Sequence, residues 1–161
     1  MSDKFVEELR RIYEEYRTEL FVFALSITRC KQSAEDAVHE AFRKVLDKGS
    51  APEALRPYLF RCVRNAALDE LRSVKRRGRR DSIFASAQEP KTASSALSAS
   101  EMDEVLEHLS VDERECIVLK LYSGLSFKEI AETRRASPNT VASWYRRGLN
   151  KLRAHFEEVK T

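Results

Sequence analysis

The sequence predicts an all-α protein of two helical domains joined by a flexible linker. Apolar residues recur every three or four positions along most of the 161 residues, which is the spacing of amphipathic helices. Only four Gly and four Pro leave little turn chemistry for a many-stranded sheet. Between residues 81 and 100 the composition shifts to Ser and Ala, with too little apolar content for a core. We therefore expect domains at 1–80 and 101–161 around a linker at 81–100.

Three helices are predicted in the first domain. A long amphipathic helix, or two in series, covers residues 5–27. A second helix is expected to start at Ser33, with Asp36 completing a capping box, and to stop near Gly49. The third starts at about Pro57 and carries apolar residues on one face and mainly basic residues on the other. We expect one face of this helix to pack and the other to be free to bind.

The second domain is expected to begin at Ser100, where Asp103 could complete another capping box. It continues into a helix that carries the apolar residues Cys116, Ile117, Leu119 and Leu121. Gly124 is suited to end that helix in left-handed geometry.

The segment after Gly124 has the pattern of a helix-turn-helix. Ser126 and Glu129 form a capping box, so that a short helix starts here. Ser137 offers a second N-cap, and Pro138 takes the first helical position, where its missing N–H costs nothing. The second helix ends in the basic run 146–153, which makes DNA the leading partner. The alternative is a pair of capped surface helices.

Basic residues gather in two places, although the net charge is only +3. Eight cations lie between Arg61 and Arg80 against Asp69 and Glu70, enough to neutralise several phosphates. Such a cluster can also merely complement the dipole of its own helix. The second cluster lies beside Trp144, an aromatic residue near the exposed side of its helix and a candidate base contact. Its cations are Arg146, Arg147, Lys151 and Arg153.

No pattern in the sequence indicates catalysis, a cofactor or a metal. Cys30, Cys62 and Cys116 are scattered, and we expect three buried thiols in a reducing cytosol. Asp36 and Glu40 lie one turn apart and could hold a metal, but a solvated or partner-binding face explains them better. No run is long enough to span a bilayer and no export signal is visible, so we expect a cytoplasmic protein that is not an enzyme.

Two separated motifs resemble regions 2 and 4 of the sigma-70 family, in particular the small extracytoplasmic-function (ECF) sigma factors of bacterial RNA polymerase. The first consists of residues 33–42 followed by 58–72, and the second runs from Leu109 through Leu152. Order, spacing, connector and length agree with a two-domain sigma factor. The resemblance implies that the partners are core RNA polymerase, promoter DNA and an anti-sigma factor. The linker would then thread toward the active-site channel of the polymerase.

The first motif implies two binding surfaces. The acidic face of the helix after Ser33 matches the surface that docks on the clamp helices of the largest polymerase subunit, where charge complementarity gives orientation and on-rate. Its residues are Asp36, His39, Glu40 and Arg43. The helix from Pro57 and the loop before it match the part that opens the −10 promoter element and captures a non-template base. The exposed candidates are Arg61, Asn65, Asp69, Arg72, Lys75, Arg76 and Arg77.

The second motif implies that the recognition helix enters the major groove at the −35 element. Arg147 would read a base pair and carry specificity, whereas Lys120 on the preceding helix would contact a phosphate and carry affinity. The candidates are Lys120, Ser137, Thr140, Ser143, Trp144, Arg146 and Arg147.

The sequence departs from the family pattern at several positions. His39 replaces the usual Gln, and residues 133–136 replace the usual apolar turn with its Gly. If Arg135 takes the left-handed conformation of that Gly, the strain is about 1 kcal/mol. Ala142 and Trp144 stand where family members are often polar or basic, so an unusual −35 sequence is expected.

Two other functions compete with a sigma factor. A stand-alone transcriptional regulator could carry the same helix-turn-helix and dimerise on a palindrome, but the first domain does not resemble a receiver or ligand-binding domain. A helical protein that mimics a sigma factor and sequesters an anti-sigma partner would keep the partner-binding surfaces yet fail to start transcription.

Overall fold

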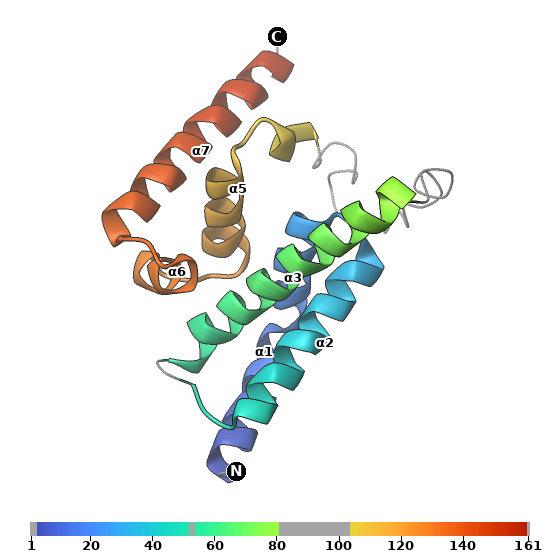
Figure 1. The fold of residues 1–161 in the computed structure, drawn as a ribbon. Coiled ribbons are helices and arrows are strands. Elements are labelled where there is room, and N and C mark those ends of the chain that lie inside the picture. Colours follow the sequence, from blue (N-terminus) through green and yellow to red (C-terminus); the bar gives the residue numbers. More distant parts are fainter. Residues whose placement is uncertain (1–2, 52–53, 81–103, 161) are drawn as a thin grey trace.

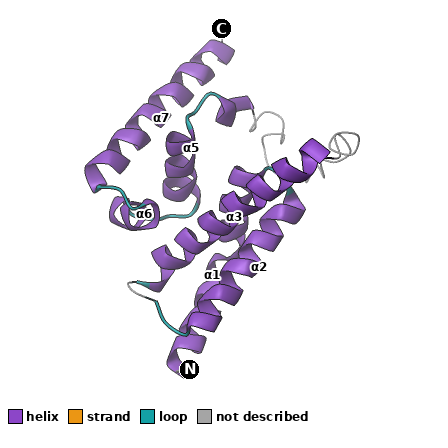
Figure 2. Ribbon diagram, viewed as in Figure 1, coloured by secondary structure: helices purple, strands orange, loops and turns teal. Residues whose placement is uncertain are grey.

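The computed structural model describes residues 3–51, 54–80 and 104–160. Within these ranges every regular element is helical, as Figure 2 shows, which confirms the predicted all-α class. The predicted linker at 81–100 and the predicted cap of Ser100 and Asp103 lie outside the described residues.

The first block is a bundle of three helices, α1 (Asp3–Thr28), α2 (Lys31–Lys48) and α3 (Leu55–Arg80), shown in Figure 1. The predicted first helix is a single continuous element. Its apolar stripe packs against the other two helices, and Phe23 on α1 lies 5.9 Å from Phe60 on α3, measured between ring centroids. Both rings are fully buried, so they form the centre of this part of the core.

The predicted start of α2 at Ser33 is wrong. The helix begins at Lys31 with Cys30 as its N-cap residue, which makes no side-chain capping bond. Arg29 has φ +56°, and this left-handed residue turns the chain so that the helix starts early. Ser33 is therefore buried inside the helix, and the Asp36 carboxylate accepts a hydrogen bond from the Gln32 side chain at 3.0 Å instead of completing a cap.

The ends of the next elements follow the predicted turn chemistry. Gly49 closes α2 with φ +75°, and its N–H donates to the Val45 carbonyl at 3.0 Å. Helix α3 begins at Leu55, two residues before the predicted Pro57, so the proline lies in the first turn, where it is tolerated.

The second block contains a short helical segment at 104–107, followed by α5 (Val111–Ile117), a π-helical turn η1 (Val118–Tyr122), α6 (Phe127–Arg134) and α7 (Pro138–Lys160). The predicted capping box of Ser126 and Glu129 is present. Ser110 and Glu113 form a second box at the start of α5, which was not predicted. Gly124 has φ +73°, as its left-handed role requires.

The two blocks pack on each other. Helix α3 lies against α6, and α1 contacts α5 and η1 (Figure 1). The buried apolar residues of both blocks, from Phe60 in the first to Leu125 in the second, belong to one continuous cluster. The two predicted domains are thus in contact in this structure, and the sequence did not predict this contact.

Candidate promoter and polymerase interfaces

The helix-turn-helix consists of α6, a short turn and α7. Ser137 caps α7 by accepting the Thr140 N–H at 3.1 Å, and Pro138 is its first residue, as predicted. Arg135 adopts the left-handed conformation with φ +54° and ψ +48°, so the strain expected from the missing Gly is present.

Arg134 replaces the apolar packing that the turn lacks. Its side chain is 8% exposed and forms an ion pair with Asp112 on α5 at 2.5 Å. The guanidinium also stacks on the Trp144 ring at 4.8 Å, a cation–π contact. Trp144 is half-buried and one of its faces is covered in this way, so the side chain contributes to the packing of the helix pair as well as lining α7.

Several polar side chains on α7 are exposed or half-exposed. Thr140, Arg146 and Arg147 are exposed, and Ser143 is half-buried and accepts a hydrogen bond from Arg146 at 3.5 Å. Gly148 lets α7 approach α5, because a Cβ at this position would lie 3.0 Å from the Ile117 side chain. The close approach fixes the rotation of α7 and thereby the direction of its polar face.

Arg147 has an intramolecular partner that the sequence did not reveal. Its Nε lies 3.7 Å from the carboxylate of Glu113, which Lys151 contacts more closely, at 2.7 Å. Burial tends to raise the pKa of Glu113, but hydrogen bonds from Lys151 and Ser110 outweigh it, and the pKa lies below its ordinary value. The charge of Glu113 is thus compensated mainly by Lys151, and the Arg147 side chain remains 59% exposed.

Lys120 is placed differently from the residues of α7. It lies in η1, is half-buried, and its ammonium sits 4.7 Å from the centre of the Phe127 ring. This contact holds the Lys120 ammonium beside the first residue of α6. Lys120 therefore lies on a different element from the candidate residues of α7.

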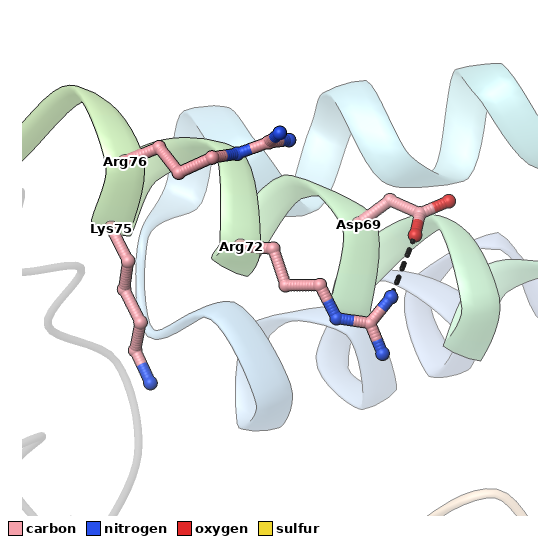
Figure 3. A pocket seen from close by; sticks show the side chains of 4 residues that line it. All are labelled: Asp69, Arg72, Lys75 and Arg76. Carbon is pink, nitrogen blue, oxygen red and sulfur yellow. Dashed lines mark hydrogen bonds and ion pairs between the residues drawn. The ribbon is translucent and has the colours of Figure 1, made fainter.

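The basic residues near the C-terminal end of α3 form an exposed surface. Asp69, Arg72, Lys75 and Arg76 line one open hollow on this helix. Figure 3 shows Arg72 extending toward Asp69, with which it pairs at 3.2 Å, while Lys75 and Arg76 leave the helix in other directions. Arg77 is exposed one residue further along.

The remaining −10 candidates lie earlier on α3. Asn65 is exposed, and Arg61 is half-buried with its guanidinium 5.2 Å from the centre of the Tyr58 ring. Arg61 also lines a groove of about 480 Å³ together with residues of the helix-turn-helix, among them Lys128, Arg135 and Pro138. The beginning of α7 therefore lies next to the first block.

The predicted polymerase surface on α2 carries mixed charge. The guanidinium of Arg43 donates hydrogen bonds to both carboxylate oxygens of Glu40, at 2.7 and 3.0 Å, and to the Asp47 carboxylate at 3.1 Å. The hydrogen bond from Arg43 lowers the pKa of Glu40. His39 and Asp36 are exposed beside this pair. The surface is thus a network of opposite charges rather than a purely acidic face.

The structure also corrects the description of the cysteines. Cys116 alone of the three is buried, and burial raises its pKa to about 11. Cys30 and Cys62 are half-buried. In the part of the chain that the structure describes, no three His, Cys, Asp or Glu side chains come together as a metal site would require. No described helix is long and apolar enough to cross a membrane.

Comparison with known proteins decides the family. The model of sigma-70 region 2 matches residues 12–77, and the model of sigma-70 region 4 matches residues 99–152. The RNA polymerase sigma factor CarQ of Myxococcus xanthus is 30% identical over 145 residues, which cover 86% of this chain and 83% of CarQ. The chain belongs to the sigma-70 family of RNA polymerase sigma factors.

Other relatives place the chain in the ECF group of sigma factors. The ECF sigma factor SigX of Bacillus subtilis is 25% identical across 96% of this chain and 86% of its own length. The ECF sigma factor SigL of Mycobacterium tuberculosis is 28% identical across 94% and 90%. Among solved structures, the sigma factor RpoE of Bartonella quintana, in complex with the anti-sigma factor NepR, has a TM-score of 0.71 at 26% identity and covers 97% of this chain and 98% of that chain.

These findings establish the function at the level of the family. The protein is an ECF sigma factor that binds core RNA polymerase and directs promoter recognition in transcription initiation. A stand-alone helix-turn-helix regulator is not favoured, because region 2 matches most of the first block.

Proposed function

We propose that this sigma factor contacts two promoter elements through α3 and α7 while α2 docks on core RNA polymerase. The observation that carries the proposal is the pair of cationic faces, one on a region 2 helix and one on the recognition helix of region 4. The working units are residues 1–80 and 101–161, with 81–100 as the connection. Two weak contacts made by linked domains act together as one strong contact.

Helix α3 binds the −10 element. The exposed cations Arg72, Lys75 and Arg76 hold the phosphates of the separated strand. Asn65 is uncharged and Asp69 is acidic, so neither attracts a phosphate. Both side chains contact bases instead. Arg61 and Arg77 extend the cationic surface in both directions along the helix.

The first half of α7 reads the −35 element in the major groove. Arg147 contacts a guanine, and Arg146, Ser143 and Thr140 complete the reading surface, with Ser137 and Trp144 at its edge. Lys120 binds a phosphate from its place beside Phe127. Specificity and affinity are therefore divided between different side chains.

The charged network on α2 docks on the polymerase. Asp36, His39, Glu40 and Arg43 present both signs of charge, which favours one orientation of the partner over others. Because the similar sigma factor RpoE is bound by an anti-sigma factor, we also propose that an anti-sigma factor controls this chain. The protein works by binding, not by catalysis, in the cytoplasm, where the polymerase acts.

Reconstituted transcription tests this function. Purified core enzyme with the full chain is expected to give promoter-dependent transcripts from some members of a library of DNA fragments, and core enzyme alone is expected to give none. If no fragment yields a transcript that depends on the chain although the two proteins form a complex, the role in initiation is refuted, and a mimic that only sequesters partners becomes the better description.

A further inference from the structure

A buried carboxylate on α5 faces two cations of the recognition helix. The side chain of Glu113 is only 5% exposed. Its oxygen Oε1 accepts hydrogen bonds from the Lys151 ammonium at 2.7 Å and from the Ser110 backbone N–H at 2.9 Å. Its other oxygen, Oε2, lies 3.7 Å from Nε of Arg147. One carboxylate outside the recognition helix thus contacts two successive turns of α7.

The backbone brings this carboxylate to α7. Gly148 allows a close approach of the two helices, because a Cβ here would lie 3.0 Å from the Ile117 side chain and 3.5 Å from the Cβ of Glu113. Residues 147 and 151 are one helical turn apart, so both reach the same carboxylate. The capping box with Ser110 fixes the Glu113 side chain at the start of α5. The carboxylate is therefore held in place independently of Arg147.

Arg147 belongs to the same stripe of α7 as other candidate base contacts. Thr140, Ser143 and Trp144 precede it at helical spacing, so the four side chains share one face of the helix. The contact with Glu113 is made through Nε. The terminal nitrogens of the guanidinium can therefore still bind the O6 and N7 atoms of a guanine.

The neighbouring Arg146 is held differently. It is exposed, and its guanidinium donates to the Ser143 hydroxyl of its own helix at 3.5 Å. A neutral hydroxyl at this distance restrains a guanidinium less than a buried carboxylate does. An arginine side chain has many rotamers, and ordering it on binding costs entropy. Because Glu113 already restrains Arg147, this cost is reduced and the side chain can reach fewer positions in the groove.

Glu113 is charged under the conditions of DNA binding. Burial acts to raise its pKa, but hydrogen bonds from Lys151 and Ser110 bring the pKa below its ordinary value. The carboxylate therefore keeps its negative charge at neutral pH. Lys151 compensates that charge, so Glu113 restrains Arg147 without adding a net negative charge next to the DNA phosphates.

We propose that Glu113 is a positioning residue for −35 recognition, which holds the Arg147 guanidinium in the orientation that reads one base pair. Glu113 touches no DNA in this role and acts only through Arg147. The inference rests on the function proposed above, in which Arg147 contacts a guanine. It adds that the specificity of this contact depends on a side chain of α5, outside the recognition helix.

Binding of the reconstituted holoenzyme to single-base-pair variants of the −35 element tests this role. Discrimination is the ratio of the dissociation constants for the substituted and the preferred base pair, taken at the position where Arg147→Ala lowers it. Glu113→Gln removes the charge, and glutamine at the third helical position keeps the capping box. We expect this variant to lose about three- to tenfold in discrimination, and no more than Arg147→Ala loses.

Affinity for a random-sequence duplex gives a second readout. Glu113→Gln is expected to bind this duplex at least as tightly as wild type, because a negative charge is lost. A merely structural defect would weaken binding to both kinds of DNA. Glu113→Asp keeps a negative charge at the start of α5 but withdraws it from Arg147, so it serves as a second variant and should show the same loss of discrimination.

A double-variant cycle separates positioning from stability. Glu113→Gln/Arg147→Ala is expected to discriminate as poorly as Arg147→Ala alone, because no guanidinium is left to position. The control Ser110→Ala removes the hydroxyl of the same capping box but keeps the backbone N–H that binds Glu113, and it should keep wild-type discrimination. Circular dichroism checks that each variant is folded.

Failure of this role and failure of the proposed function give different results. If Arg147→Ala relaxes one base pair and Glu113→Gln leaves discrimination there unchanged, the positioning role is overturned while the proposed function stands. If Arg147→Ala relaxes no base pair, the assignment of Arg147 is wrong and the inference falls with it. Additive losses in the cycle, or an equal loss in Ser110→Ala, would reject positioning in favour of a structural role for Glu113.

Discussion

Single side chains carry the unusual features of this helix-turn-helix. Arg135 takes a left-handed conformation that glycine adopts more easily, and Arg134 replaces apolar packing with an ion pair to Asp112 and a stack on Trp144. The resemblance to the family pattern pointed to the strained residue, because Arg135 stands where the usual turn has its Gly. It did not predict the role of Arg134, because the partners of an arginine depend on tertiary packing.

Replacing Arg135 with glycine is expected to raise the free energy of unfolding by about 1 kcal/mol. The substitution removes the cost of a side chain in the left-handed region. Urea denaturation measures the change. The control Lys128→Gly, at an exposed position inside α6, should lower the free energy of unfolding by about 1 kcal/mol, because there the glycine only adds flexibility. Destabilisation by both substitutions would show that Arg135 is not strained.

The three thiols should react with iodoacetamide in a fixed order at pH 8. A hydrogen bond from the Ser33 backbone lowers the pKa of Cys30, whereas burial raises the pKa of Cys62 and brings that of Cys116 to about 11. The lowered pKa leaves more thiolate at Cys30 and makes it the fastest, whereas burial and a raised pKa make Cys116 the slowest. Mass spectrometry follows each site, with the denatured chain as the control in which the rates converge. Equal rates for Cys30 and Cys116 in the folded chain would contradict this assignment.

Arg147→Ala and Lys120→Ala are expected to affect DNA binding in different ways. Loss of Arg147 should remove about 1–3 kcal/mol of discrimination at one −35 base pair, since Lys151 still compensates Glu113 and the fold is kept. Loss of Lys120 should weaken binding to all sequences alike and reduce its salt dependence. Affinities for a set of single-base-pair promoter variants, measured at several salt concentrations, distinguish the two. Uniform effects of both substitutions would defeat the division of roles.

At the scale of elements, the local capping chemistry decided which boundaries could be predicted. The box at Ser126, the cap at Ser137 and the left-handed glycines lie where the sequence indicates, because each depends only on residues within one turn. The start of α2 was missed because Arg29, a residue with no turn preference, provides the left-handed bend. The pattern Ser110-x-x-Glu113 is a local signal of the same kind, and it marks the start of α5, which was not predicted.

Ser110→Ala is expected to lower the free energy of unfolding by about 1 kcal/mol. The substitution removes the hydroxyl that accepts the Glu113 N–H at 3.2 Å. Thermal and urea unfolding, followed by circular dichroism, give the value. Ser110→Asn should recover most of the loss, because asparagine caps helices well. Failure of asparagine to recover stability would assign the effect to packing rather than to the cap.

At the scale of the whole molecule, periodicity and motifs predicted two helical domains but not their contact. A helical pattern shows which face is apolar, and it does not show whether that face packs within its own domain or on another. One example is Glu115, the last residue of a charged stretch, which is buried against Arg64 from the other block. Pairs as distant in sequence as Arg56 and Glu129 have no local pattern that would reveal them.

Hydroxyl-radical footprinting of the reconstituted polymerase on a promoter that this sigma factor recognises tests the central claim most directly. At polymerase concentrations that saturate the promoter, we predict two separate protected stretches, of which Arg146→Ala/Arg147→Ala weakens only the upstream one and Arg72→Ala/Lys75→Ala/Arg76→Ala weakens only the downstream one. A single protected stretch, or loss of both stretches together with either folded variant, would contradict the assignment of α7 and α3 to two promoter elements.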